Sequence, residues 1–261
     1  MLRNIKSLTG FKLHATDGEL GQVDGFYFDD QTWDIRYMVV NTGSWLSGRK
    51  VLISPAALKT PDWKSKSFPV ALTLEQVRNS PDIDTEKTVT RQHELDLNRH
   101  YAWPIYWGDG FYAGSMSGGT LFPPTPEEEK EEPVTAGGVN HLQSTRAVTG
   151  YRVHAVDGLI GHVEDFIVEE GQWIIRYLVA GTGTWLPGRK VLLSPGWIES
   201  VDWETAEVFV ALTREEVKDS PVFDPSKPLS PDYISGLHDH YGRPGPAGAA
   251  DRKAQSQSRK G

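Results

Sequence analysis

A glycine-rich stretch occurs twice in the chain, as NTGSWLSGRKVLISP at residues 41–55 and as GTGTWLPGRKVLLSP at residues 181–195. Each stretch combines glycines, a tryptophan and an Arg-Lys pair, and each ends in an apolar run closed by Ser-Pro. A phosphate-binding loop would place Gly-Lys-Ser/Thr at the start of a helix, with amide groups directed at the phosphate. We therefore interpret both stretches as structural corners that lead into a β-strand. A partner-binding surface is the alternative, and an anion site is the least favoured interpretation.

The two stretches belong to a longer internal repeat. Gly10 aligns with Gly150, and the match continues at this offset of 140 residues as far as Pro81 and Pro221. Within the repeat, WDIRYMVV matches WIIRYLVA, and VALTLEQVRNSP matches VALTREEVKDSP. A unit that occurs only twice indicates a duplicated domain rather than a solenoid.

The repeat predicts two domains joined by a linker. Copy 1 is expected at residues 1–107 and copy 2 at residues 141–244. Residues 108–140 are rich in Gly, Pro, Ser and Glu, and residues 245–261 have a similarly polar, glycine-containing composition. Such segments bury too little apolar surface to offset the entropy lost on ordering, so we expect a linker and a disordered tail.

Each copy is expected to be a small antiparallel β-barrel of about six strands, because short alternating segments are separated by turn signals. In copy 1 these segments lie at residues 9–14, 21–29, 33–41 and 50–54, near residue 58, and at 68–72. Capping boxes at residues 73–76 and 213–216 then predict a short helix in each copy, which ends before a proline. The fold class is therefore mainly β.

A barrel of this size should be solid, because about eight strands already leave an interior that side chains just fill. The expected filling is Trp33, Ile35, Tyr37 and Val39, with their equivalents in copy 2. The opposite face of the equivalent strand in copy 2 contains Ile174 and Leu178 and is more apolar than an exposed face should be. We expect this face to lie beneath the chain's own helix and C-terminal segment, or at an interface with the other copy or another subunit.

The copies are expected to dock as a pseudo-two-fold pair. A domain of fewer than about 100 residues buries a modest fraction of its surface and often depends on a neighbour. Intramolecular docking of the two copies would supply that neighbour, and association as a homodimer is left open.

The order of the motifs resembles the bacterial PRC-barrel family. D-G-x-x-G-x-V, W-x-I-R-Y-x-V, W-L-x-G-R-K-V-L-x-S-P and L-T-x-E-x-V follow one another within residues 3–104 and again within 143–244. The family includes the cytoplasmic domain of the photosynthetic reaction-centre H subunit and the C-terminal domain of RimM. The chain shows neither the membrane helix of the H subunit nor the separate N-terminal domain of RimM. The resemblance implies a docking or assembly role, with a family link to photosynthetic light-reaction complexes.

Tryptophan and arginine are favoured anchors at protein interfaces. If the glycine-rich corners bind a partner, the residues expected to make contact are Trp45, Arg49, Trp185 and Arg189. Ile174 and Leu178 are the candidates on the apolar strand face.

An aromatic segment, YAWPIYWGDGFY from Tyr101, follows copy 1 and has no aromatic equivalent after copy 2. It contains Trp103 and Trp107. Such a segment either wraps the barrel and covers its edge or forms an exposed patch for a partner. Both interpretations stay open at this point.

The chemistry-bearing residues do not indicate a catalytic or metal site. The chain has no cysteine, which excludes disulfides and thiolate ligands. His14 and His154 are equivalent, so we expect a structural hydrogen bond from each. The HDH sequence at residues 238–240 would need further ligands placed by the fold to hold a metal. We expect no enzyme activity, no cofactor and no metal.

Charge and hydropathy limit the partners. The net charge is −8 and the pI is about 5.5, which disfavours nucleic acid because binding to phosphates requires a basic surface. No apolar run approaches the ~20 residues that span a bilayer. We expect a cytoplasmic protein-binding or assembly adaptor, in solution or peripheral to the inner membrane. The alternative is a small-ligand or metal-binding sensor that uses the groove between the copies.

Overall fold

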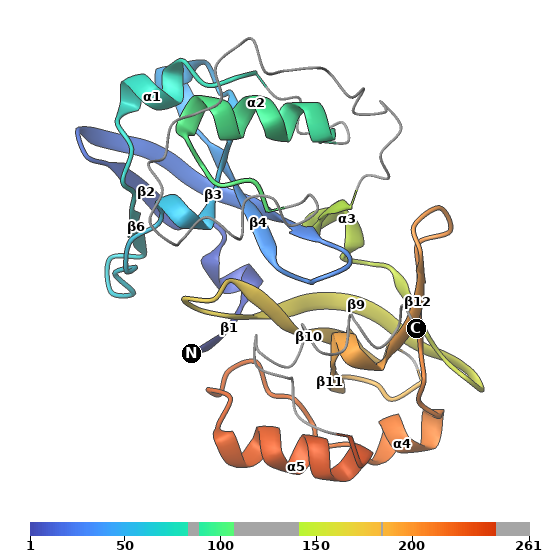
Figure 1. Cartoon of the computed structure of the whole chain (residues 1–261). Helices are drawn as coiled ribbons and strands as arrows, with labels where there is room; N and C mark the ends of the chain where they lie inside the picture. Colours follow the sequence, from blue (N-terminus) through green and yellow to red (C-terminus); the bar gives the residue numbers. More distant parts are fainter. Residues whose placement is uncertain (83–88, 107–140, 184, 244–261) are drawn as a thin grey trace, which may run out of the picture.

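The computed structural model describes residues 1–82, 89–106, 141–183 and 185–243 (Figure 1). It is mainly β, with one sheet built largely by each copy and with helices on the outer sides of the two sheets. The strands of copy 1 are β2 (Lys12–Ala15), β3 (Gly18–Asp29), β4 (Ile35–Asn41), β5 (Lys50–Ile53) and β6 (Ser67–Pro69). Those of copy 2 are β8 (Arg152–Ala155), β9 (Gly158–Glu169), β10 (Ile174–Gly181), β11 (Lys190–Leu193), β12 (Ile198–Asp202) and β13 (Glu207–Val210).

Short helices connect and cover these strands. The α-helices are α1 (Leu74–Arg78), α2 (Arg91–Tyr101), α3 (Thr145–Val148), α4 (Arg214–Asp219) and α5 (Pro231–Tyr241). Single 3-10 turns are η1 (Ile5–Leu8), η2 (Gly43–Leu46), η3 (Pro55–Ala57) and η4 (Pro195–Trp197). The predicted capping boxes at Thr73 and Thr213 are confirmed, with each threonine side chain accepting from the third residue of its helix. Within the described residues, no helix combines the length and apolar character needed to cross a membrane.

The expectation of closed antiparallel barrels is wrong. The strand order is β5-β4-β3-β2-β6 in copy 1 and β11-β10-β9-β8-β13-β12 in copy 2, and in neither described sheet do the two ends pair. Both sheets are also mixed, because β6 runs parallel to β2 and β13 runs parallel to β8. In copy 1 the chain passes through η3, and β6 then enters the sheet beside β2 and parallel to it. In copy 2 the chain passes through η4 and β12, and β13 then enters the sheet beside β8 and parallel to it.

The two sheets are completed by an exchange of strands between the copies. β1 (Leu2–Asn4), the opening strand of copy 1, pairs antiparallel with β9 of copy 2. β7 (Leu142–Ser144), the opening strand of copy 2, pairs antiparallel with β3 of copy 1. Both pairings have the same register at the repeat offset of 140 residues. This reciprocity is the arrangement that a pseudo-two-fold pair of copies requires.

A second reciprocal contact joins the hairpins that follow β3 and β9. The Ile35 amide donates to the Trp173 carbonyl at 2.7 Å, and the Ile175 amide donates to the Trp33 carbonyl at 2.8 Å. Trp33 and Trp173 both adopt a positive φ, 61° and 56°. The same backbone conformation therefore places both hairpins against each other.

Aromatic side chains fill the space between the copies. Phe28 lies 5.9 Å from Phe166, and the Trp173 ring lies 6.2 Å from Phe26 and 6.0 Å from Phe68 (ring centroids). Most of the buried apolar residues of both copies consequently form one continuous cluster. The copies share a core, although their sequences read as two repeats.

The expected assignment of strand faces is wrong beyond Ile35. The register between β3 and β4 shifts so that Ile35 opposes Phe28 while Tyr37 opposes Tyr27. An extra residue in one strand changes the phase of alternation. Tyr37 and Val39 therefore leave the main core and pack in a separate cluster with Leu97 of α2.

Helices α2 and α5 cover the outer faces of the two sheets (Figure 1). The His100 ring Nε2 lies 2.8 Å from the Gln76 carbonyl, and His240 Nε2 lies 2.8 Å from the Glu216 carbonyl. These equivalent contacts fix each covering helix to the preceding short helix. The last described helix of each copy thus covers one face of that copy's sheet.

The contact between the copies includes one buried carboxylate without a counterpart in copy 1. Asp165 Oδ1 accepts from the Phe166 amide at 2.8 Å and from the Lys6 amide of copy 1 at 3.2 Å. Its equivalent in copy 1 is Gly25. Burial raises the pKa of Asp165, against the lowering effect of these two hydrogen bonds and of nearby lysines.

We expect Phe166→Ala to destabilise the whole chain by about 3–5 kcal/mol, because it leaves a cavity in the core shared by both copies. Calorimetry should show one transition that shifts to lower temperature as a unit. Val222→Ala, at a side chain that is 54% exposed, is the matched control and should leave the transition unchanged. Two transitions, of which only one moves, would contradict the shared core.

Asp165 predicts a pH-dependent stability. Because its folded pKa lies above its unfolded pKa, its charge opposes folding, and this cost develops as the pH rises through the two pKa values. Asp165→Asn retains the acceptor oxygen and removes the charge. The variant should be more stable than the parent chain at pH 7, and the difference should disappear near pH 3. Denaturant titrations at both pH values measure it, and a difference that grows on acidification would refute the assignment.

Candidate functional site

The glycine-rich corner of copy 1 is tied to the end of α1. The Arg49 guanidinium donates to the carbonyls of Ser80 and Pro81, both at 2.6 Å. The Trp45 indole Nε1 donates to the Leu20 carbonyl at 2.6 Å. Arg49 also donates to the carbonyl of Arg78, the last residue of α1, at 3.3 Å, and a cationic donor at this position stabilises the helix end.

Copy 2 builds its corner in the same way. The Arg189 guanidinium donates to the Ser220 carbonyl, which is the equivalent of Ser80. The half-buried Trp185 ring lies beneath the Arg214 guanidinium at 4.6 Å. Both arginines therefore have structural partners, and the geometry of each loop is that of a corner.

The other residues proposed for partner contact lie in different places. Ile174 is 8% exposed and forms a β-bridge with Asp34 between the copies. Leu178 is fully buried in the shared core, where no external partner reaches it. Trp103 is half-buried and stacks on Tyr101 with centroids 4.2 Å apart. Trp107 lies outside the described residues.

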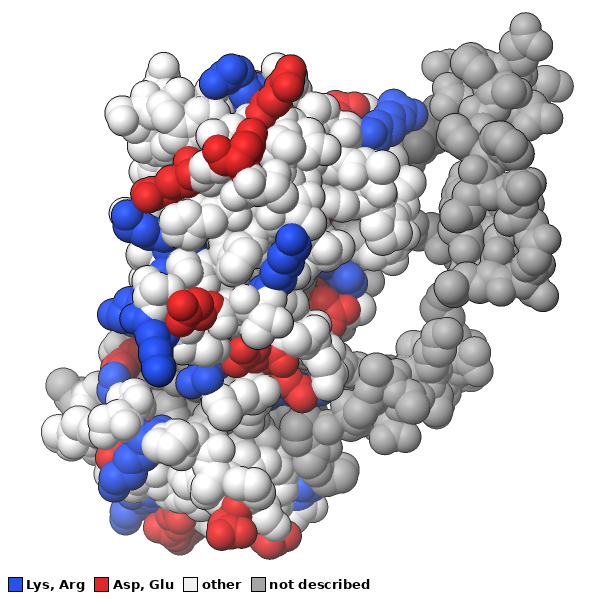
Figure 2. Space-filling model, turned by 90° about the vertical axis from the view of Figure 1, so that its left-hand side faces the viewer, with Lys and Arg blue, Asp and Glu red and all other residues white. Residues whose placement is uncertain are grey.

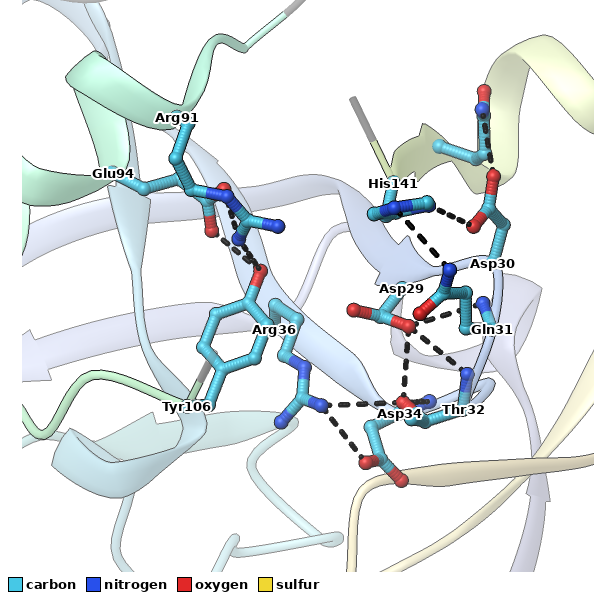
Figure 3. A network of polar contacts seen from close by, with 11 residues as sticks. Asp29, Asp30, Gln31, Thr32, Asp34, Arg36, Arg91, Glu94, Tyr106 and His141 are labelled. Carbon is cyan, nitrogen blue, oxygen red and sulfur yellow. Dashed lines mark hydrogen bonds and ion pairs between the residues drawn. The ribbon is translucent and has the colours of Figure 1, made fainter. Parts of the chain in front are cut away.

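A buried polar cluster in copy 1 brings α2, β4 and the segment after α2 together. Glu94, near the start of α2, has a side chain that is only 1% exposed. Its Oε2 accepts from the hydroxyls of Tyr106, at 2.5 Å, and Tyr37, at 3.3 Å. Its Oε1 accepts from the Arg91 guanidinium at 3.0 Å. We call Tyr37, Arg91, Glu94 and Tyr106 the Glu94 cluster; Figure 3 shows Arg91, Glu94 and Tyr106 of this cluster.

Arg36 closes the cluster on the side of the Tyr106 ring. Its guanidinium carbon lies 3.8 Å from the ring centroid, a distance at which the cation attracts the ring face. The same guanidinium contacts Asp34 at 3.1 Å and Thr32 Oγ1 at 3.2 Å. The turn at the end of β3 thus holds Arg36 over Tyr106 (Figure 3).

The environment sets the protonation of this cluster. Burial raises the pKa of Glu94, and the hydrogen bond from Tyr106 and the charge of Arg91 oppose the increase. Burial, followed by the charge of Glu94, raises the pKa values of the Tyr37 and Tyr106 hydroxyls well above their usual range. Both phenols therefore remain protonated at neutral pH and act as hydrogen-bond donors.

Copy 2 fills the corresponding positions without an acidic residue. Ile234 stands at the position of Glu94, and Pro231 at the position of Arg91. The Tyr177 hydroxyl instead lies 2.8 Å from His238 Nε2. The sequence reasoning missed the cluster, although the replacement of an apolar residue by glutamate between the aligned copies would have located it.

Most histidines are engaged in structural contacts. His154 Nε2 lies 3.1 Å from Glu207 Oε1, which agrees with the structural hydrogen bond expected of this residue. His14 makes no side-chain hydrogen bond among the described residues, because Ser67 stands at the position of Glu207. Of the HDH sequence, His238 contacts Tyr177 and His240 contacts the Glu216 carbonyl. Among the residues that the structure describes, no group of three or more His, Cys, Asp or Glu residues could hold a metal ion.

Polar contacts line the strand exchange. His141 Nδ1 lies 3.0 Å from Asp30 Oδ1 (Figure 3). Glu170, the equivalent of Asp30, contacts Arg3 at 3.3 Å, and the guanidinium of Arg3 also lies over the Trp63 ring at 3.9 Å. These polar contacts lie where the copies meet, at the rim of the shared apolar core.

The tip of the β8–β9 hairpin exposes apolar side chains. Val156 is 64% exposed and Leu159 is 48% exposed. Arg214 connects this tip to Trp185: its amide donates to Asp157 Oδ1 at 2.8 Å, and its guanidinium covers the Trp185 ring. We call Val156, Leu159, Trp185 and Arg214 the copy 2 tip. Copy 1 has Thr16 and Glu19 at the positions of Val156 and Leu159.

Charge does not separate into one large patch on the face that Figure 2 shows. Lys and Arg side chains alternate there with Asp and Glu side chains. A surface that binds nucleic acid would instead concentrate Lys and Arg along one face or stripe.

Comparisons with known proteins identify no relative. No family model matches the chain, and no curated protein matches it. The geometry of the Glu94 cluster and of the copy 2 tip is consequently the evidence for function.

We expect Glu94→Ala to lower the free energy of unfolding by about 2–3 kcal/mol, because Arg91, Tyr37 and Tyr106 lose their charged acceptor. Glu94→Gln retains an acceptor oxygen and should cost less. Glu19→Ala breaks only the exposed pair with Lys12 and should stay within about 0.5 kcal/mol of the parent chain. Urea titration of the three variants measures the order, and equal stability of Glu94→Ala and Glu19→Ala would show that the cluster contributes nothing.

Proposed function

We propose that the chain is a non-enzymatic protein-binding or assembly adaptor and that it contacts its partner through the copy 2 tip. The observation that carries this proposal is the exposure of Val156 and Leu159 where the other copy has Thr16 and Glu19. Both copies have the same fold, and copy 1 has polar residues at this tip. The fold therefore does not require the apolar residues that copy 2 has there. Exposed apolar residues that cluster on a surface are typical of an interaction site.

The tip is suited to binding because contacts within the chain already hold its side chains in place. The Asp157 carboxylate holds the Arg214 amide, and the side chain of Arg214 packs against Gly158 and covers Trp185. A preorganised surface loses less conformational entropy on association than a loop that must first order. Tryptophan and arginine beside an apolar pair are residues that commonly supply the energy of an interface.

The sequence resemblance to PRC-barrel proteins supports the same class of function. Members of that family are best known for docking and assembly, and the resemblance adds a link to photosynthetic light-reaction complexes. A cytoplasmic location, free or peripheral to the inner membrane, belongs to this proposal. The alternative of a ligand sensor between the copies has less support, because Phe28, Phe166 and Trp173 fill the space between them.

The test replaces the apolar residues of the copy 2 tip by the residues at the same positions of copy 1. Val156→Thr with Leu159→Glu gives copy 2 the residues of copy 1, and we expect it to lose the proteins that the full chain captures by cross-linking in native lysate. Thr16→Ala with Glu19→Gln changes the equivalent tip of copy 1 and should leave capture unchanged. Sedimentation velocity of the same variants reports whether the captured partner is a second copy of the chain. Identical capture by both double variants would contradict the proposal.

A further inference from the structure

The segment after α2 inserts the Tyr106 side chain into copy 1 and leaves the two residues before it exposed. Helix α2 ends with Ala102 in a left-handed conformation, and the Trp103 amide donates to the Asn98 carbonyl at 3.0 Å. Pro104 and Ile105 are exposed, Ile105 to 42%. Tyr106 then turns inward to the Glu94 cluster. The contacts of its own side chain therefore hold Tyr106 against copy 1.

The groups around Tyr106 together form a receptor for a phenol. The buried Glu94 carboxylate accepts from the hydroxyl at 2.5 Å, and the Arg91 guanidinium lies 3.4 Å from the same oxygen. Arg36 covers the ring face. A carboxylate matched to the hydroxyl and a cation matched to the ring select tyrosine over phenylalanine, because a bare ring would leave a hydrogen-bonding site of Glu94 unused.

Copy 2 shows that the fold does not need this receptor. Its equivalent sheet face is closed by Ile234 and by the contact between Tyr177 and His238. Copy 1 has Asn98 at the position of His238, and the Asn98 side-chain nitrogen is buried without a hydrogen-bond partner among the described residues. A buried carboxylate and an unsatisfied buried amide are costly choices for a purely structural contact.

We propose that the pocket formed by Arg36, Tyr37, Arg91 and Glu94 is a binding site for a tyrosine side chain, occupied within the chain by Tyr106, and that a tyrosine-bearing segment of a partner protein displaces Tyr106. The ligand class is a para-substituted phenol. The site lies on copy 1 and is independent of the copy 2 tip, so either can fail without the other. Release of Tyr106 would free residues 103–106 at the same time as the partner binds.

The first experiment empties the site. Tyr106→Ala should bind p-cresol, which restores the phenol, and the ligand should raise the melting temperature of this variant more than that of the parent chain, in which Tyr106 competes for the pocket. Toluene lacks the hydroxyl and should bind about tenfold more weakly. Adding Glu94→Gln to Tyr106→Ala should reduce the preference for p-cresol. Equal binding of toluene and p-cresol would reveal an unselective apolar cavity and overturn the proposal.

The second experiment tests displacement in the otherwise native chain and remains informative if Tyr106→Ala does not fold. The chain has no cysteine, so Ile105→Cys gives a single site for a fluorescent label at an exposed position. N-acetyl-tyrosinamide should lower the fluorescence anisotropy of the label as Tyr106 leaves its pocket, whereas N-acetyl-phenylalaninamide should not. Unchanged anisotropy with the tyrosine compound would identify Tyr106 as a fixed structural contact and overturn the proposal.

Discussion

The exchange of opening strands between the copies is the contact on which the rest of the structure depends. β1 and β7 are each three residues long, too short to be stable alone, yet each extends the sheet of the other copy. The exchange brings Phe28 against Phe166 and places both hairpin tryptophans at the centre. The fraction of surface that a domain buries falls as the domain becomes smaller, and the shared core adds buried surface to each copy.

This arrangement determines which surfaces remain for recognition. The inner sides of β3 and β9 are used by the exchange, and α2 and α5 cover the outer faces. Hairpin tips and the segments beside the covering helices are left. Two sites that differ between the copies, the copy 2 tip and the Glu94 cluster, lie in these two places. Contacts that maintain the fold are by contrast repeated, as in the corners of Arg49 and Arg189.

Local features could be predicted from the sequence, and long-range pairing could not. The repeat, the capping boxes and the corners depend on residues close together in the chain, and the structure contains them. The exchange involves strands of three residues, which have no readable periodicity. β6 pairs parallel with β2 because the chain crosses over before it enters the sheet. The sequence composition does not encode this crossover. The faces of β4 were misassigned because one extra residue reverses the alternation.

The same limit explains why the Glu94 cluster was missed, and the comparison between the copies shows what the cluster means. One glutamate in a helical stretch is unremarkable in sequence, and its burial depends on a strand 57 residues away, at Tyr37. A buried ion pair is weak evidence for stability, because apolar residues at the same positions often stabilise a fold equally well or better. In this chain copy 2 has an apolar residue, Ile234, at the position of Glu94, within the same fold. Folding therefore does not require the polar residues of copy 1. The property that distinguishes the Glu94 cluster is its specific recognition of the phenol of Tyr106.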